Sequence, residues 1–131
     1  MSTGRRCQSS HGSADCADIH YDELSSNKDD FTIIDVRNPG EIEHEGHIPG
    51  AHNVPLPELD DALKMGDDDF NSKYGFDKPK DGDSIVVHCQ KGSRARRAGD
   101  KMANAGMSVR VYPGSFDDWK AKGGEVNPGK P

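Results

Sequence analysis

The sequence has few cysteines and no long apolar run. Its three cysteines, Cys7, Cys16 and Cys89, are too few and too widely spaced for the disulfide framework of a small secreted protein, which favours a reducing compartment. No apolar run approaches the ~18–20 residues of a membrane-spanning helix, and the N-terminus lacks the ~7–15-residue apolar stretch of a secretory signal. We therefore expect a cytoplasmic protein that does not bind a membrane.

Net positive charge is also missing. The chain has 17 Lys and Arg against 23 Asp and Glu, which gives a formal net charge of -6. That balance argues against a nucleic-acid partner. Within the acidic background, four basic residues lie close together in the sequence: Lys91, Arg94, Arg96 and Arg97. For Arg96 and Arg97 we expect an exposed helix face, whereas Lys91 and Arg94 belong to a more informative motif.

The length of 131 residues fits one ordinary domain, which we expect to be a monomer. Residues 1–16 hold Ser, Gly, His and charged residues without hydrophobic periodicity, which indicates a disordered N-terminal tail. Residues 127–131 indicate a short C-terminal tail, so the domain extends over residues 17–126. Basic and hydroxyl residues near the N-terminus weakly resemble an organelle transit peptide, and a mitochondrial location is the alternative to the cytoplasm.

Short apolar runs alternate with helix-like segments between the two tails. Continuous β-branched runs at 31–36 and 84–88 are typical of buried strands in a parallel sheet, and weaker strand signals lie at 51–54 and 109–112. This alternation predicts an α/β fold, a three-layer domain with a mostly parallel central sheet flanked by helices. In such sheets ligands bind where strands end and helices begin.

Helix starts are marked by capping residues. Asn38, followed by Pro39 and Glu41, predicts one start, and Ser115 with Asp118 three residues later predicts a capping box at another. Small and apolar residues spaced by three and four predict a further helix over residues 92–104.

The strongest chemical signal is the segment Cys89-Gln90-Lys91-Gly92-Ser93-Arg94, which directly follows an apolar strand and opens a helix. In such a turn, successive backbone N–H groups converge on one point, and the positive end of the helix dipole adds to them. Gly92 supplies a backbone conformation that other residues adopt only with strain. A thiol at this place is stabilised as its thiolate, and Lys91 and Arg94 act in the same direction. The motif therefore predicts an activated cysteine in a small anion-binding loop.

This loop resembles the six-residue active-site loop of the rhodanese family. The segment Ile34-Asp35-Val36-Arg37, followed by Gly46-His47-Ile48-Pro49-Gly50-Ala51, resembles the first signature of that family. The segment from Tyr112 to Trp119 with Gly123-Gly124 resembles its C-terminal signature. The three motifs stand in the family's order and cover almost the whole chain outside the tails. The insertion over residues 63–79 resembles that of small eukaryotic single-domain thiosulfate sulfurtransferases.

The resemblance implies a sulfurtransferase that moves the sulfane sulfur of thiosulfate, or a similar anionic donor, through a persulfide on Cys89. The acceptor would be cyanide or a thiol such as glutathione or thioredoxin. The loop amides from Gln90 to Arg94 would hold the persulfide, and Lys91 would attract the donor. Arg94 would close the loop, with its guanidinium contacting Asp35 or the donor. No cofactor, metal or general base is required, because the thiolate is itself the nucleophile.

Several other polar and aromatic residues could act on the substrate, but we expect them to have structural roles. An ion pair or hydrogen bond that braces the loop is the leading interpretation for Asp35 and Arg37. His47 is expected to hydrogen-bond in a turn, His88 to point to the opposite side of its strand from the nucleophile, and Trp119 to pack in the core.

Alternatives to a sulfurtransferase remain open. A cysteine phosphatase or arsenate reductase also sets Cys and Arg around a cradle, but with five intervening residues where this chain has four. A non-catalytic binding module is the alternative from another class, and the retained Cys89 argues against it. Two further hypotheses concern the N-terminal region: a zinc site at Cys7, His11, Cys16 and His20, and a resolving-cysteine role for Cys7 or Cys16.

Overall fold

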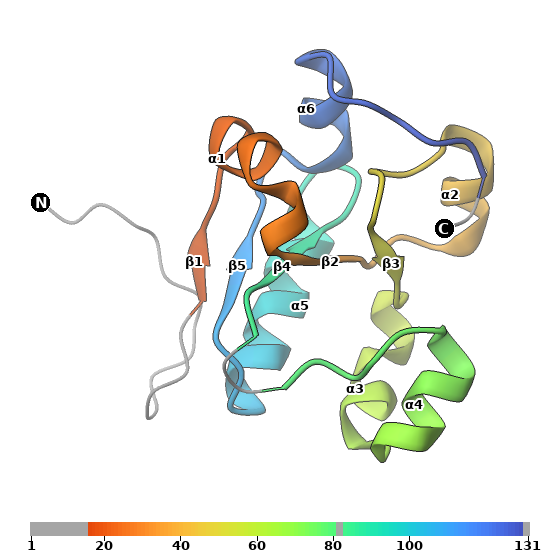
Figure 1. Cartoon of the computed structure of the whole chain (residues 1–131). Helices are drawn as coiled ribbons and strands as arrows, with labels where there is room; N and C mark the ends of the chain where they lie inside the picture. The colour runs from red at the N-terminus through yellow and green to blue at the C-terminus, as the bar shows by residue number, and fades with distance from the viewer. Residues whose placement is uncertain (1–15, 81–82, 130–131) are drawn as a thin grey trace, which may run out of the picture.

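A computed structural model describes residues 16–80 and 83–129. Five parallel strands form one sheet in the order β1-β5-β4-β2-β3. The strands are β1 (Cys16–Asp18), β2 (Thr32–Asp35), β3 (His52–Asn53), β4 (Ile85–His88) and β5 (Val109–Val111). The helices are α1 (Tyr21–Ser26), the 3-10 turn η1 (Lys28–Asp30), α2 (Pro39–Glu45), α3 (Leu56–Lys64), α4 (Asp67–Tyr74), α5 (Ser93–Asn104) and α6 (Ser115–Ala121), arranged as in Figure 1.

Both faces of the sheet are buried, which confirms the three-layer architecture expected from the sequence. On one face, side chains of α3, α4 and α5 such as Ala62, Phe70 and Ala98 pack against Ile34 and Val87. On the other face, a second cluster joins α1 and α6 to the sheet. Its members include Leu24, Ile33, Val86, Phe116 and Trp119. Because alternate strand residues enter opposite clusters, β2 and β4 read as continuous apolar runs in the sequence.

The four predicted strands are present, each within its predicted range, and α5 ends at Asn104. At α2, the Glu41 carboxylate accepts the backbone N–H of Asn38 at 3.0 Å, as its capping pattern predicts. The capping box expected at Ser115 is absent, because Gly114 is the N-cap residue and the Ser115 hydroxyl is used elsewhere. Strand β1 was not anticipated, and it begins at the last residue of the expected N-terminal tail.

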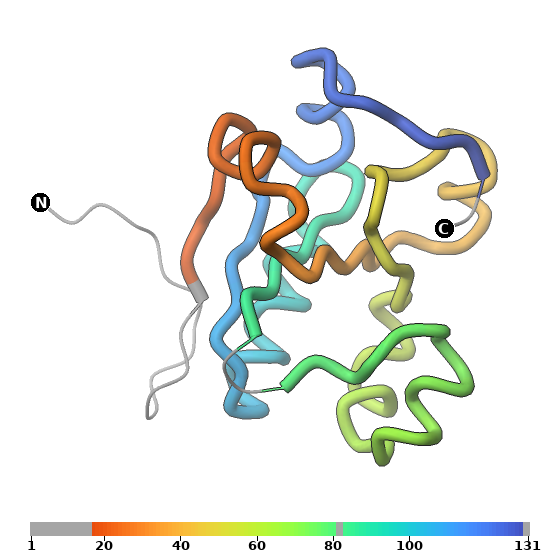
Figure 2. The backbone as a smooth tube through the Cα atoms, in the orientation of Figure 1, coloured from red at the N-terminus to blue at the C-terminus, as the bar shows by residue number. Residues whose placement is uncertain are grey.

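The C-terminal segment returns to the body of the domain beside α2 (Figure 2). The backbone of His47 exchanges two hydrogen bonds with that of Asn127, at 2.8 and 2.9 Å. The His47 Nδ1 atom lies 2.8 Å from the carbonyl oxygen of Gly129. His47 therefore holds the end of the chain against the turn that precedes β3, which agrees with the structural role expected for it.

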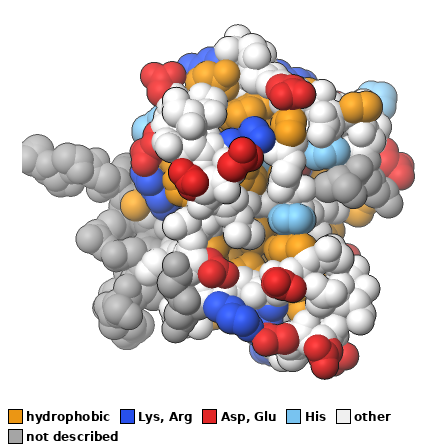
Figure 3. Space-filling model, viewed as in Figure 1, with side chains coloured by type: hydrophobic (Ala, Val, Ile, Leu, Met, Phe, Trp, Pro, Cys, Tyr) orange, Lys and Arg blue, Asp and Glu red, His pale blue; other side chains and the backbone are white. Residues whose placement is uncertain are grey.

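Within residues 16–80 and 83–129, no helix is both long and apolar enough to cross a bilayer. Acidic and basic side chains are interspersed on the face shown in Figure 3, which carries no continuous basic area. Cys7 and His11, half of the hypothetical zinc site, lie outside the described residues, as does the arginine- and serine-containing segment at 5–10.

Candidate active site

Cys89 stands where the sequence placed it, directly after β4 and four residues before the start of α5. Its Sγ atom accepts backbone N–H groups from Gly92 at 3.0 Å and from Ala95 at 3.3 Å. The Gly92 amide belongs to the expected ring, whereas Ala95 lies one residue beyond it. Two N–H groups at the start of a helix direct partial positive charge at the sulfur, which stabilises a negative charge there.

Gly92 is required by the shape of this loop. Its φ of 118° lies in the region that side chains rarely adopt, and a Cβ atom there would collide with the carbonyl oxygen of Pro113. This close approach brings the loop onto the segment between β5 and α6, which the sequence had marked only as a family signature.

The peptide groups of Cys89 are held on both sides. Its N–H donates to Ser115 Oγ at 3.0 Å, and its carbonyl oxygen accepts the N–H of Phe116 at 3.0 Å. The Ser115 hydroxyl donates in turn to the carbonyl of Tyr112 at 2.8 Å and lies 3.8 Å from Sγ. Ser115 has a φ of 58°, rare for a residue with a side chain, and this conformation accompanies the positioning of its hydroxyl under the nucleophile.

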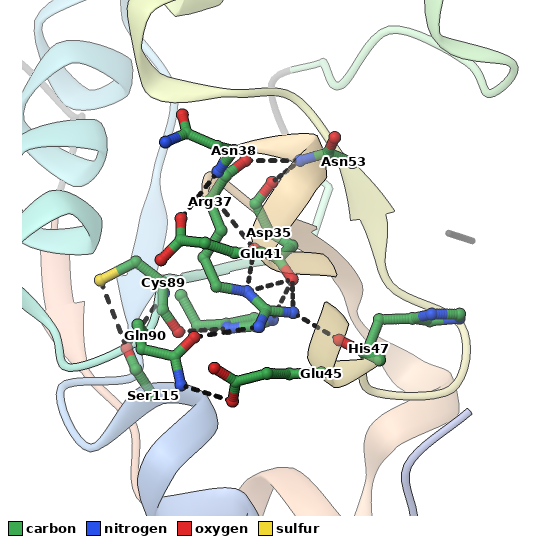
Figure 4. Close-up of polar contacts among 12 residues, drawn as sticks. Asp35, Arg37, Asn38, Glu41, Glu45, His47, Asn53, Cys89, Gln90 and Ser115 are labelled. Atoms are coloured by element: carbon green, nitrogen blue, oxygen red, sulfur yellow. Dashed lines mark hydrogen bonds and ion pairs between the residues drawn. The ribbon is translucent and has the colours of Figure 1, made fainter. Parts of the chain in front are cut away.

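Asp35 and Arg37 form a buried ion pair beneath the loop (Figure 4). The guanidinium binds both carboxylate oxygens, and its Nη2 atom lies 2.6 Å from Oδ2. It also donates to the carbonyl of Gly46 at 2.8 Å and to the side-chain oxygen of Gln90 at 3.1 Å, and its carbon centre lies 4.1 Å from the centroid of the Phe116 ring. The pair therefore reaches the loop through Gln90, which agrees with the bracing role expected for both residues.

Arg94 does not make the contact with Asp35 that the sequence suggested. Its guanidinium binds the Glu41 carboxylate through two hydrogen bonds of 2.6 and 2.9 Å, and Asp35 is already occupied by Arg37. The hydrogen bond from Arg94 lowers the pKa of Glu41 below its usual value. Arg94 thus ties the end of the loop to α2, and Ser93 begins α5.

Gln90 and Lys91 point to different sides. The Gln90 amide nitrogen donates to Glu45 at 3.2 Å and to Asp117, so this side chain faces back into the protein. The Lys91 side chain is 82% exposed, and its ammonium lies 3.7 Å from the Asp117 carboxylate. Lys91 is therefore open to the solvent, and its role in attracting the donor stays a prediction.

His88 is fully buried behind the nucleophile. Its Nδ1 atom lies 3.0 Å from the carbonyl oxygen of Cys89, which assigns the ring proton to Nδ1. Its Nε2 atom finds no hydrogen-bond partner within residues 16–80 and 83–129 and lies 3.6 Å from Asp35 Oδ2. Burial lowers the pKa of His88, so the imidazole is neutral near pH 7 and lies against both the Cys89 carbonyl and the Asp35 carboxylate.

Three side chains that were not assigned to the site from the sequence contact the loop: Glu41, Glu45 and Asp117. Each lies on a helix and meets the loop only through the fold, since Glu41 and Arg94 are 53 residues apart. Glu41 carried a capping signal that explains its contact with Asn38 and not its contact with Arg94. Trp119 packs in the core as expected, and its Nε1 donates to the carbonyl of Glu125 at 2.7 Å.

A cavity of about 570 Å³ lies elsewhere, against the outer edge of β3. Its walls include His52, Glu58 and Tyr74, and Cys89 is not among them. The His52 ring stacks on Phe76 with centroids 4.0 Å apart, and burial lowers its pKa. Burial, together with a hydrogen bond to Glu58, raises the pKa of Tyr74 to about 12. This cavity is separate from the chemistry of the cysteine loop.

Comparison with known proteins gives a consistent result. The family model of the rhodanese-like domain matches residues 18–122. A mouse protein named thiosulfate sulfurtransferase/rhodanese-like domain-containing protein 3 is 40% identical over 77% of this chain and 66% of its own length. The chain thus spans about two thirds of that relative.

A human relative and a solved human structure are also similar to this chain. One, named thiosulfate:glutathione sulfurtransferase, is 36% identical over 69% of this chain and 79% of its own length. The other is a solved structure, the human single-domain sulfurtransferase TSTD1, which superposes with a TM-score of 0.74 at 33% identity. The superposition covers 80% of this chain and 96% of that structure.

Proposed function

The chain belongs to the rhodanese-like domain family, and from that premise we propose that it is a sulfurtransferase whose Cys89 carries sulfur as a persulfide. The observation that carries the proposal is the position of Sγ, which two amide N–H groups approach at 3.0 and 3.3 Å at the start of α5. These groups favour an anion on Sγ before transfer and on the added sulfur after it.

The proposed reaction has two steps that both balance in charge. The Cys89 thiolate attacks the outer sulfur of thiosulfate, the bond between the two sulfurs of the donor breaks, and sulfite leaves with its electron pair. A thiolate acceptor then attacks the outer sulfur of the persulfide, and the Cys89 thiolate is regenerated. Neither step consumes an oxidant or reductant, and neither requires a general base, because the nucleophile enters as an anion.

The names of relatives suggest which molecules take part. Thiosulfate appears in the names of the mouse and one human relative, and glutathione in the name of that human protein. We propose thiosulfate as a donor and glutathione as an acceptor for this chain. Thioredoxin as acceptor, the monomeric state and a cytoplasmic location stay predictions.

The persulfide is tested directly by mass spectrometry. After treatment with thiosulfate and removal of excess reagent, the intact protein is expected to gain the mass of one sulfur atom, about 32 Da, because one cysteine stands in an anion-binding loop. Peptide mapping should place that sulfur on Cys89. The Cys89→Ser variant should gain nothing, whereas a Cys7→Ser/Cys16→Ser variant should behave as the wild type.

The outcome that would overturn the proposal is an unmodified Cys89 under conditions that load a known rhodanese. Hydrolysis of p-nitrophenyl phosphate faster than turnover of thiosulfate would instead favour the phosphatase alternative. If sulfur were found on Cys7 or Cys16 alone, the carrier would lie outside the loop described above.

A further inference from the structure

The charges around the Cys89 loop are balanced, although the six loop residues themselves carry only positive charges. Four basic side chains line or support the loop, and each faces a carboxylate. The pairs are Arg37 with Asp35, Arg94 with Glu41, Lys120 with Glu45 and Lys91 with Asp117. Positive potential at the sulfur therefore comes mainly from the amide groups at the start of α5, and the outer charges can adjust it.

The Lys91–Asp117 pair differs from the other three in its geometry. The Lys91 and Asp117 side chains are 82% and 42% exposed and lie 3.7 Å apart, whereas the closest atoms of the other pairs lie 2.6 or 2.7 Å apart. An exposed pair at this distance contributes little to folding. Its charges still act on any ion that approaches Cys89 from the solvent.

Asp117 is held beside the loop by more than its contact with Lys91. Its backbone N–H donates to the carbonyl oxygen of Gln90 at 3.1 Å, and its Oδ1 atom accepts the Gln90 side-chain amide. The negative charge of Asp117 is therefore fixed next to the second and third residues of the loop. Its position does not depend on the flexible Lys91 side chain.

We propose that Asp117 is a specificity-determining residue, whose carboxylate offsets the charge of Lys91 and so reduces the preference of the site for a dianionic sulfur donor over a monoanionic one. The inference rests on the proposed sulfurtransferase function. Thiosulfate carries two negative charges and a thiosulfonate carries one. A fixed negative charge near the entrance raises the energy of the approaching dianion about twice as much as that of the monoanion.

The two donors undergo the same reaction at Cys89. With thiosulfate, the thiolate attacks the outer sulfur and sulfite leaves. With methanethiosulfonate, the thiolate attacks the equivalent sulfur, the bond between the two sulfurs breaks, and methanesulfinate leaves with the electron pair. Both steps yield the same Cys89 persulfide anion, so the comparison isolates the charge of the donor from the chemistry of the cysteine.

The test is the ratio of kcat/KM for thiosulfate to kcat/KM for methanethiosulfonate in wild type and in Asp117→Asn. The asparagine keeps an oxygen that can accept the Gln90 amide and removes the negative charge. At low ionic strength the ratio is expected to rise about threefold in the variant, the effect of one unit charge at several ångströms in a solvent-exposed site. In ~0.5 M salt the difference should largely disappear because the charges are screened.

A matched control is Asp60→Asn. Asp60 lies on α3 and pairs with Lys101 at 2.9 Å, so this variant also removes one acidic charge and one lysine contact, but away from the cysteine loop. Its donor ratio should equal that of the wild type. A change in Asp117→Asn that merely loosened Gln90 would slow both donors in proportion and leave the ratio unchanged.

The inference and the proposed function fail in different ways. If wild type forms the Cys89 persulfide with both donors and Asp117→Asn leaves their ratio unchanged at low salt, the role of Asp117 is overturned and the sulfurtransferase proposal survives. An equal rise in Asp60→Asn would also overturn it, because the effect would then follow net charge alone. If neither donor loads Cys89 in wild type, the proposed function itself is wrong.

Discussion

Two acid–base pairs flank the cysteine loop, and they differ in almost every physical respect. The Asp35–Arg37 pair has no exposed side-chain surface and a closest contact of 2.6 Å, and Arg37 bonds onward to the loop. The Lys91–Asp117 pair is open to solvent and 3.7 Å apart. A buried pair loses its hydration and must be fully satisfied, so it fixes geometry, whereas an exposed pair keeps its water and mainly alters the local field. The buried pair therefore fixes the geometry of the loop, whereas the exposed pair acts on the selectivity of the site.

The largest expected effect comes from breaking the buried pair. Arg37→Met should lower the free energy of unfolding by about 3–5 kcal/mol, because it leaves the buried Asp35 carboxylate without its counter-charge. Urea denaturation followed by circular dichroism measures the loss. In Asp35→Asn/Arg37→Met the stranded charge is removed, and part of the stability should return. A loss below about 1 kcal/mol in Arg37→Met would contradict the expectation that an unpaired Asp35 charge destabilises the fold.

A smaller effect is expected from His88, which lies against the buried pair. Since burial lowers the pKa of His88 in the folded protein, the unfolded chain binds a proton below pH ~6.5 that the folded chain does not. Stability should therefore fall as the pH drops below ~6.5, by at most about 1.4 kcal/mol per pH unit from this residue. His88→Asn, whose amide can still donate to the Cys89 carbonyl, should show a shallower fall between pH 7 and pH 5. Parallel curves for the two proteins would contradict this assignment.

The smallest effect on stability is expected at the exposed pair. Lys91→Ala should change the free energy of unfolding by less than about 0.5 kcal/mol, because an exposed ion pair contributes little. The same variant should raise the KM for thiosulfate, since it removes the cation that the donor meets first. Denaturation and steady-state assays on one preparation give both values. An unchanged KM would remove Lys91 from donor binding, and a large loss of stability would erase the contrast between the two pairs.

The sequence was a good guide wherever the signal was local. Strands β2 and β4 could be predicted from the sequence because both faces of the sheet are covered, and strands buried on both faces consist of continuous apolar runs. The cysteine loop could be recognised because its cysteine, its glycine and its basic residues stand in six consecutive positions. Gly92 in particular stands where its φ of 118° requires glycine.

Contacts between distant segments could not be predicted in this way. Of the two contacts expected for Arg94, with Asp35 or with the donor, the one with Asp35 is absent because Arg37, two residues from Asp35, binds that carboxylate. Ser115 and Asp118 match the sequence pattern of a capping box, but Ser115 has a φ of 58° and its hydroxyl bonds to Cys89 and Tyr112 instead. Strand β1 has three residues without an apolar pattern and exists because β5 offers it an edge.

The packing of Trp119 has a practical consequence for spectroscopy. It is the chain's single tryptophan, it is 2% exposed, and its ring lies 5.2 Å from that of Tyr21. A side chain at Gly124 would overlap its indole ring. Because α6 begins with the serine under Cys89 and carries this indole one turn later, tryptophan fluorescence from the intact, unlabelled protein reports on one defined place. Its emission is expected to change when unfolding exposes the buried indole to water.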